Sequence, residues 1–234
     1  MQYILDLLPG LGTTLSLWAI ILAVGMPGGL LLGYALGHGP LRAAAVAVVN
    51  IARGFPGLVT LYFVYAGLPE LGILLSNFAA VVLAFAFTTM GYTADIFRSA
   101  IQNVPRSQTE AATALGLGFW KTQRLVILPQ ALRSVLPALL GFTVIVLQAT
   151  SLGYSVGAKE LTGLSYNLGA IAFEALPYML ATGLIYLTVC LAIGRLAAWS
   201  ERRLSRPRRL AAAAPAPSSP GAAHTPIPVP NTTE

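Results

Sequence analysis

Five long stretches of the sequence contain no Asp, Glu, Lys or Arg, and they constrain the fold more than any other feature. They run over Leu7 to Leu41, Gly54 to Pro69, Leu71 to Ala94, Ser134 to Ala158 and Ala175 to Gly194. A helix needs about 20 apolar residues to cross a bilayer. Four of the stretches reach that length, and only 9% of the chain is charged. The sequence therefore predicts an all-α, polytopic membrane protein with five spanning helices.

The limits of the spans follow from the apolar stretches and their breaks. We expect spans near Leu11 to Leu36, Asn77 to Phe97, Ala131 to Ser151 and Leu176 to Ala198. The stretch from Gly54 to Pro69 is too short and must borrow turns from a neighbouring segment. Pro27-Gly28-Gly29 predicts a kink in the first span, and Leu41 to Ala52 predicts a helix along the interface. The outer segment from Leu152 to Glu174 is expected to be too irregular to span.

The basic residues fix the expected orientation. With the N-terminus outside and five spans, the inner segments hold 13 of the 14 Lys and Arg residues and leave only Lys159 outside. Cytoplasmic segments carry such an excess of basic residues. We therefore expect an N-out, C-in topology. This distribution also accounts for the net charge of +6 without a nucleic-acid partner. The first stretch lacks a basic leader and is expected to remain as a span rather than act as a signal peptide.

A polar island between the third and fourth expected spans has a readable local order. Ser107-Gln108-Thr109-Glu110 fits a capping box at a helix start, and Gly116 fits a helix stop in the left-handed conformation. The chain is expected to restart at Phe119 and to break at Pro129. Ala111 and Ala112 would leave one face of the first short helix bare, so that another protein can approach it closely. The island is thus predicted to be a cytoplasmic docking element.

Metal, redox and cofactor chemistry find no support in the sequence. Cys190 is the only cysteine, and neither His38 nor His224 has a helical partner for a metal site. We expect no metal, no cofactor and no catalytic residue. The Ala/Pro/Ser-rich segment 205–234 has the composition of a disordered cytoplasmic tail, which leaves residues 1–204 as the membrane domain.

Four motifs, in order, resemble those of a known family. The island resembles the EAA loop of ABC-importer permeases: Glu-Ala-Ala, three residues, Gly, nine residues, an aliphatic, any residue, then Leu-Pro. Its counterparts here are Glu110, Ala111, Ala112, Gly116, Val126, Leu128 and Pro129. Arg53-Gly54-Phe55-Pro56 resembles Arg-Gly-Thr-Pro, the segment Tyr92 to Arg98 resembles Tyr-Leu-Ala-Glu-Ile-Phe-Arg, and Thr150-Ser151-Leu152 resembles the end of Lys-Asp-Thr-Ser-Leu. Together they resemble the polar amino acid uptake branch of these permeases over about Leu11 to Leu204.

The resemblance implies a type I importer fold in the bacterial inner membrane and a transport role without catalysis. It implies a second permease subunit, identical or similar, two cytoplasmic ATPase subunits and an extracytoplasmic solute-binding protein. The loop over 99–130 would contact the ATPases through Glu110, Ala111, Ala112, Gly116, Leu128 and Pro129. The sequence agrees in lacking a phosphate-binding loop of its own. Gln148-Ala149 departs from the family's Lys-Asp, so an amino acid is implied more firmly than any particular one.

The sequence leaves two possible roles open for several side chains. Thr89, Tyr92, Gln148, Thr150 and Ser151 either line a substrate path or hold helices together, as polar groups in spans do. Glu110 either contacts an ATPase or only caps its own helix. Asp95 and Arg98 are expected to form an i,i+3 ion pair, with gating as the other reading. The alternative function is a channel or secondary transporter acting alone. It is disfavoured because the expected spans hold no charge near the midplane, and a membrane enzyme is disfavoured because no catalytic cluster appears.

Overall fold

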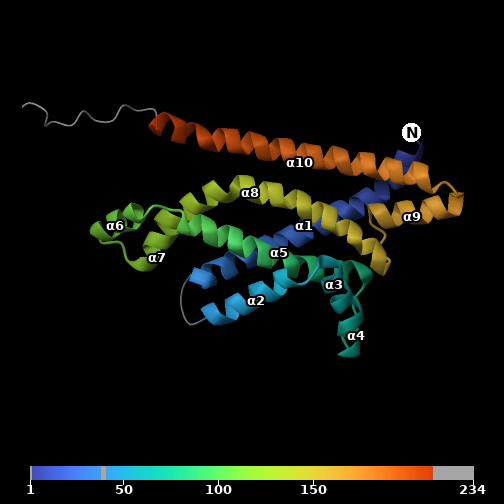
Figure 1. The fold of residues 1–234 in the computed structure, drawn as a ribbon, viewed down its shortest axis with the longest axis horizontal. Helices are drawn as coiled ribbons and strands as arrows, with labels where there is room; N and C mark the ends of the chain where they lie inside the picture. Colours follow the sequence, from blue (N-terminus) through green and yellow to red (C-terminus); the bar gives the residue numbers. More distant parts are fainter. Residues whose placement is uncertain (1, 38–40, 213–234) are drawn as a thin grey trace, which may run out of the picture.

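The structure, a computed structural model, describes residues 2–37 and 41–212. Every regular element in those ranges is helical, which confirms the all-α prediction. Four helical segments are long and apolar enough to cross a membrane: Gln2–Gly37, Asn77–Gln102, Phe119–Val156 and Ala175–Arg202. A fifth span requires a bent pair of helices. Figure 1 shows the long helices packed side by side along the length of the molecule.

Helices α1 (Gln2–Gly37) and α5 (Asn77–Gln102) form the centre of the bundle. They approach closely because glycines of α1 face α5. A Cβ atom at Gly25 would lie 2.6 Å from Thr89 Cγ2, and one at Gly33 would lie 2.6 Å from the carbonyl oxygen of Ala94. Helix α1 is continuous through Pro27. The small residues around Pro27 thus serve helix packing, a common use of glycine in membrane helices.

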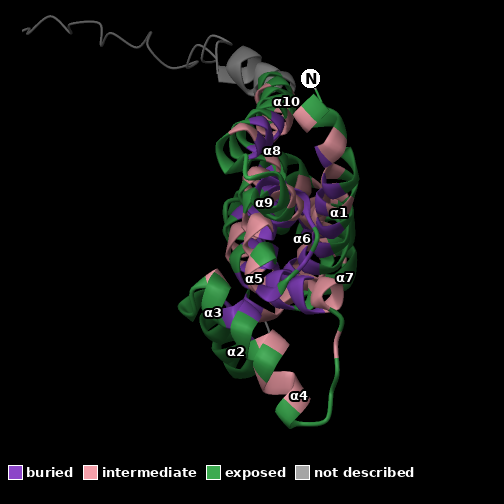
Figure 2. Cartoon of the chain, turned by 90° about the vertical axis from the view of Figure 1, so that its right-hand side faces the viewer, coloured by how far each residue is buried: buried purple, intermediate pink, exposed green. Residues whose placement is uncertain are grey.

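The second expected span is a bent pair of helices. Helix α2 (Arg42–Gly54) is followed by α3 (Gly57–Tyr62), the π-helical turn η1 (Phe63–Gly67) and α4 (Leu68–Glu70). The chain bends by 104° between the two arms, around Phe55 and Pro56, because Pro56 cannot continue a helix. Figure 2 shows α4 extending away from the rest of the bundle. The stretch therefore counts as a fifth span only if both arms of this bent pair are taken together.

Pro129 does not interrupt its helix, and the sequence expectation is wrong here. Helix α7 (Phe119–Thr122), the π-helical turn η2 (Gln123–Ile127) and α8 (Leu128–Ala149) follow one another directly. A proline ring collides with the carbonyl group four residues earlier in a regular α-helix. The wider π-helical turn immediately before Leu128 and Pro129 relieves that collision. The second short helix of the polar island is thus the beginning of the span that follows it.

The outer segment is more regular than its sequence suggests. The 3₁₀ helix η3 (Thr150–Val156) leads into α9 (Leu161–Ala172), which packs on α1 and α10. Leu161 is fully buried together with Leu7 of α1 and Tyr178 of α10. Helix α10 (Ala175–Ala212) then runs on into the stretch assigned from the sequence to the tail, whose remainder, 213–234, lies outside the described residues.

The main core lies where α1, α3, α5 and α8 meet the outer segment. Its buried members are Leu17, Ile21, Leu61, Val81, Ala84, Phe85, Val146, Val156 and Ala158. Many large apolar side chains remain exposed on the outward faces, including Leu31 and Leu184. A protein surrounded by lipid can expose such groups, because lipid tails are as apolar as the side chains.

Candidate functional site

The polar island folds into helix α6 (Arg106–Ala114), a tight turn and α7. Gly116 has a φ of 74°, which confirms the left-handed helix stop. The N–H of Leu117 donates to the carbonyl of Ala112 at 3.0 Å, and the N–H of Gly116 donates to Thr113 at 2.9 Å. These two hydrogen bonds define a Schellman motif, which satisfies the last carbonyl groups of α6.

The predicted capping box is wrong. Helix α6 begins at Arg106, after Pro105, and no side chain caps its first turn. Pro105 takes the N-cap position two residues before Ser107, because its fixed φ, here −56°, suits a helix entry. Ser107 therefore lies inside the helix. Glu110 is exposed, and it carries no hydrogen bond that would explain it as a cap.

The EAA-loop residues differ in how much surface they offer. Glu110, Ala111 and Gly116 are exposed, whereas Ala112 is only 3% exposed and Leu128 and Pro129 are half-buried. The bare face expected from Ala111 and Ala112 is thus reduced to Ala111. Large apolar side chains are exposed on the same turn and on α7 and η2: Leu115, Phe119, Trp120 and Leu125. Such a cluster on an otherwise polar segment is typical of a protein interaction surface.

Two contacts join the loop to the membrane helices. The Trp120 ring stacks on Tyr34 of α1, with centroids 6.1 Å apart. Gln130 Nε2 of α8 donates to Gln108 Oε1 of α6 at 3.2 Å. These contacts connect α7 to α1 and α6 to α8.

The ion pair expected between Asp95 and Arg98 does not form. Asp95 pairs instead with Arg53, the last charged residue of α2. The Arg53 guanidinium also lies 5.3 Å from the centroid of the Tyr92 ring, a cation–π distance. Local spacing favoured Arg98, but the packing of α2 on α5 brings Arg53 to the same carboxylate.

The five residues considered for a substrate path fall into two groups. Thr89 and Thr150 are buried within the chain. Thr89 packs against Gly25 of α1, and the Thr150 hydroxyl donates a hydrogen bond to the Leu147 carbonyl. Tyr92, Gln148 and Ser151 retain accessible surface. Gln148 Nε2 lies 3.9 Å from Cys190 Sγ of α10, and Tyr92 lies beside Phe142 of α8. Thr89 and Tyr92 thus differ in exposure, although they lie one helical turn apart on α5.

A buried carboxylate in the outer segment was missed by the sequence analysis. Glu160 is fully buried and accepts hydrogen bonds from the N–H groups of Gly163 at 2.7 Å and Thr162 at 2.9 Å. Tyr186 of α10 donates its hydroxyl hydrogen to Glu160 at 3.1 Å. Burial raises the pKa of the Glu160 carboxyl, against the lowering effect of these hydrogen bonds. The only sequence signal was an acid before the apolar start of α9, and Glu is not among the common N-cap residues.

A cavity lies beside this carboxylate network, in the outer segment. It has a volume of about 390 Å³ and is lined by Tyr62, Tyr154, Tyr166, Asn167 and small residues. Gly163 lies in its wall, and a side chain does not fit there, because a Cβ would lie 2.2 Å from the Ala158 carbonyl oxygen. Within the described ranges, no cluster of three or more His, Cys, Asp or Glu residues could hold a metal ion.

The chain resembles known transport proteins over most of its length. Residues 25–206 match the family described as binding-protein-dependent transport system inner membrane component. The probable amino-acid ABC transporter permease protein PatM of Vibrio harveyi is 30% identical over 222 residues, which cover 88% of this chain and 96% of PatM. The glutamine transport system permease protein GlnP of Escherichia coli is 35% identical over 199 residues, which cover 82% of this chain and 91% of GlnP.

Solved structures agree with the sequence relatives. An amino acid ABC transporter crystallised with histidines superimposes with a TM-score of 0.81 at 29% identity, covering 86% of this chain and 95% of that one. The MetNI methionine ABC transporter shares the fold with a TM-score of 0.68 at 21% identity, covering 84% and 93%. Proteins of this kind are non-catalytic transport components that work with ATPase and binding-protein partners. This chain belongs to the family of binding-protein-dependent transport system inner membrane components, as a permease of the ABC importer type.

Proposed function

We propose that this chain is the membrane permease of an ATP-driven importer for an amino acid. The observation that carries the proposal is the exposed helix, Schellman turn and helix at Arg106 to Thr122. It presents Glu110 and Ala111 next to exposed Leu115 and Trp120, a surface suited to a groove on an ATPase. The amino acid class is supported by the names of PatM and GlnP.

The complete importer contains two permease chains, two ATPase chains and one binding protein on the outer side. We place the N-terminus outside and the C-terminus in the cytoplasm, because five spans in this orientation put 13 of the 14 basic residues on the inner side. In this orientation α6 and α7 meet the ATPases. ATP-driven closure of the ATPases displaces α6 through Glu110, Ala111 and the Gly116 turn. The displacement passes to α1 and α8 through the contacts of Trp120 and Gln130.

The substrate path of this chain runs along the faces that keep accessible polar surface. Tyr92, Gln148 and Ser151 meet the substrate directly, while Thr89 and Thr150 set the helix packing behind them. The tyrosine-lined cavity between η3 and α9 lies on the outer side, where the binding protein releases its ligand. A stand-alone secondary transporter needs an acid available to a coupling ion. Asp95 pairs with Arg53 and Glu160 caps α9, which counts against that alternative.

The proposal is tested with the chain reconstituted in proteoliposomes together with a cognate ATPase and binding protein. We expect ATP hydrolysis to rise when the binding protein is loaded with its amino acid, and uptake to require internal ATP. Uptake driven by an ion gradient through this chain alone, without ATP or an ATPase, would establish the secondary transporter instead.

A further inference from the structure

A cavity of about 290 Å³ lies at the base of the α6 loop, where the chain leaves the membrane helices. Its walls come from the end of α1, the end of α5, the first turns of α6, and η2. The polar residues that line it are Tyr34, Arg98, Gln102, Arg106, Thr109 and Gln123. One wall thus belongs to the bundle and the opposite wall to the loop.

The lining is positively charged, and no carboxylate compensates the charge. Arg98 and Arg106 form no ion pair with any described residue, and the lining contains no Asp or Glu. Asp95, one turn from Arg98, is already paired with Arg53. The Nε atom of Arg98 is buried without a hydrogen-bond partner among the described residues. Arg98 is half-buried and Arg106 is exposed. Two cations without a carboxylate, one of them with a buried N–H that lacks an acceptor, favour an anionic ligand.

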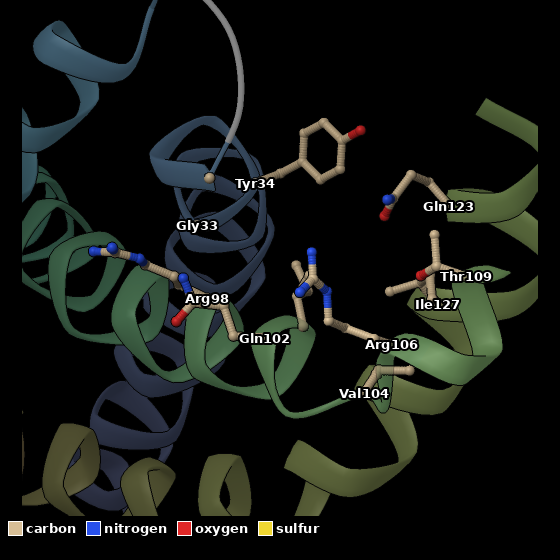
Figure 3. Close-up of a pocket in the computed structure, with 11 residues that line it drawn as sticks. Gly33, Tyr34, Arg98, Gln102, Val104, Arg106, Thr109, Gln123 and Ile127 are labelled. Atoms are coloured by element: carbon tan, nitrogen blue, oxygen red, sulfur yellow. The ribbon is translucent and has the colours of Figure 1, made fainter. Parts of the chain in front are cut away.

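The side chains of the loop are placed to hold such a ligand beneath Tyr34. Figure 3 shows Arg106 reaching into the space beneath Tyr34, with the Gln123 amide facing it from η2, while the Arg98 guanidinium points away from both. Gln123 and Thr109 add neutral hydrogen-bond donors from the loop side. Arginine with neutral donors around it is a common arrangement for phosphate recognition.

We propose that this cavity binds the phosphate group of an anionic ligand and thereby holds the α6 loop against α1 and α5. A phosphate reaches the cavity from one of two sources, the head group of an anionic phospholipid or free phosphate. The lipid source rests on the proposed topology, in which the cavity lies at the cytoplasmic head groups. Neither source depends on the identity of the transported amino acid. The bound phosphate links Arg106 of the loop to the bundle wall, and so it sets how firmly α6 is held.

The test measures phosphate binding directly in the purified, fully assembled transporter. Wild type and Arg106→Gln are compared for phosphatidylglycerol retained by native mass spectrometry, with phosphatidylcholine as the neutral lipid. Thermal melting is followed with added phosphatidylglycerol or inorganic phosphate. We expect Arg106→Gln to weaken binding of the anionic ligand by on the order of tenfold, the loss of one charge-assisted contact. Arg98→Gln combined with Arg106→Gln should weaken binding further.

A matched control removes the same charge elsewhere. Arg133 and Arg195 are exposed and line no part of the cavity. Arg133→Gln with Arg195→Gln should therefore leave phosphate binding unchanged. Stabilisation by phosphatidylglycerol alone assigns the site to a lipid, and stabilisation by inorganic phosphate assigns it to the free anion. The proposal is overturned if Arg106→Gln binds both ligands as wild type does, or if its effect equals that of the control pair. It is also overturned if Arg106→Gln releases the ATPase subunits but binds both ligands normally. Arg106 would then contact an acidic residue of the ATPase rather than a phosphate.

Discussion

The Arg53 guanidinium forms an ion pair with the Asp95 carboxylate and so joins the end of α2 to α5. Arg53 lies in α2, just before the 104° bend between α2 and α3. The ion pair therefore holds the α2 arm of the bend against α5. Tyr92 adds a cation–π contact with the same guanidinium. The ion pair thus restrains the bent helix pair close to the point where its direction changes.

Arg53→Gln and Asp95→Asn should each lower the melting temperature of the assembled transporter, and the double variant should cost little more than either. Both side chains are more than a third exposed, so we expect a coupling energy of only about 0.5–1 kcal/mol from the double-mutant cycle. The control cycle pairs Asp95→Asn with Arg98→Gln, where no coupling is expected. Stronger coupling of Asp95 to Arg98 would contradict the observed pairing.

The close approach of α1 and α5 makes Gly33 intolerant of a larger residue. In Gly33→Ala the new Cβ would lie 2.6 Å from the Ala94 carbonyl oxygen, a backbone atom that cannot rotate away. We expect a loss of about 1–3 kcal/mol, seen as a lower melting temperature in detergent. Gly12→Ala, in the same helix, meets no atom within 4 Å and should be neutral or slightly stabilising. Equal effects of the two substitutions would argue against this packing.

Glu160 should make stability depend on pH. Burial raises the pKa of its carboxyl, so at intermediate pH the folded state binds more protons at this group than the unfolded state. The raised pKa of Glu160 stabilises the folded state. This stabilisation is fully present below the unfolded pKa of about 4.3 and is lost as the pH rises through the folded pKa. Glu160→Gln, a neutral isostere, should remove this dependence in melting curves recorded across that range. A wild-type curve parallel to that of the variant would refute the assignment.

The same residue caps α9, and that role is tested separately. Glu160→Leu leaves the N–H groups of Thr162 and Gly163 without their acceptor. We expect a loss of about 0.5–2 kcal/mol relative to Glu160→Gln, measured by thermal melting at one pH. If both variants melt together, the cap contributes nothing to stability.

The Gly116 turn should be essential for coupling but not for folding of the bundle. Gly116→Val places a β-branched residue at a φ of 74°, at a local cost of about 1–2 kcal/mol. We expect normal membrane insertion and loss of both stimulated ATP hydrolysis and uptake. Gly118→Val is the matched control, because Gly118 has a φ of −68° and open space around it. Uptake by Gly116→Val at the level of the control would remove this turn from the coupling mechanism.

Glu110→Ala distinguishes the two readings left open by the sequence. Glu110 caps nothing in the structure, so its removal should leave the melting temperature of the isolated permease unchanged. We expect weaker co-purification of the ATPase and a partial loss of uptake, because an exposed carboxylate would be lost from the docking surface. A lower melting temperature with unchanged ATPase binding would instead return Glu110 to a structural role.

The sequence by itself determined the elements whose causes are local. Long uncharged stretches place these segments in lipid. They must then be helical, because no water is available there to form hydrogen bonds with the backbone. The position of Gly116 determined the turn of the loop, since few residues other than glycine adopt its φ readily. The motif spacing from Glu110 to Pro129 identified the family before any fold was known.

The tertiary structure decided which residues meet across helices, because such contacts depend on packing between segments far apart in the sequence. Local spacing assigned Asp95 to Arg98, but Arg53 is the partner, since α2 packs on α5. Thr89 and Tyr92 share a helical turn, yet the glycines of α1 bury one while the other stays accessible. Pro129 continues a helix because a π-helical turn precedes it. The network of Glu160 and Tyr186, and the cavity of Arg98 and Arg106, exist only once the helices are packed together.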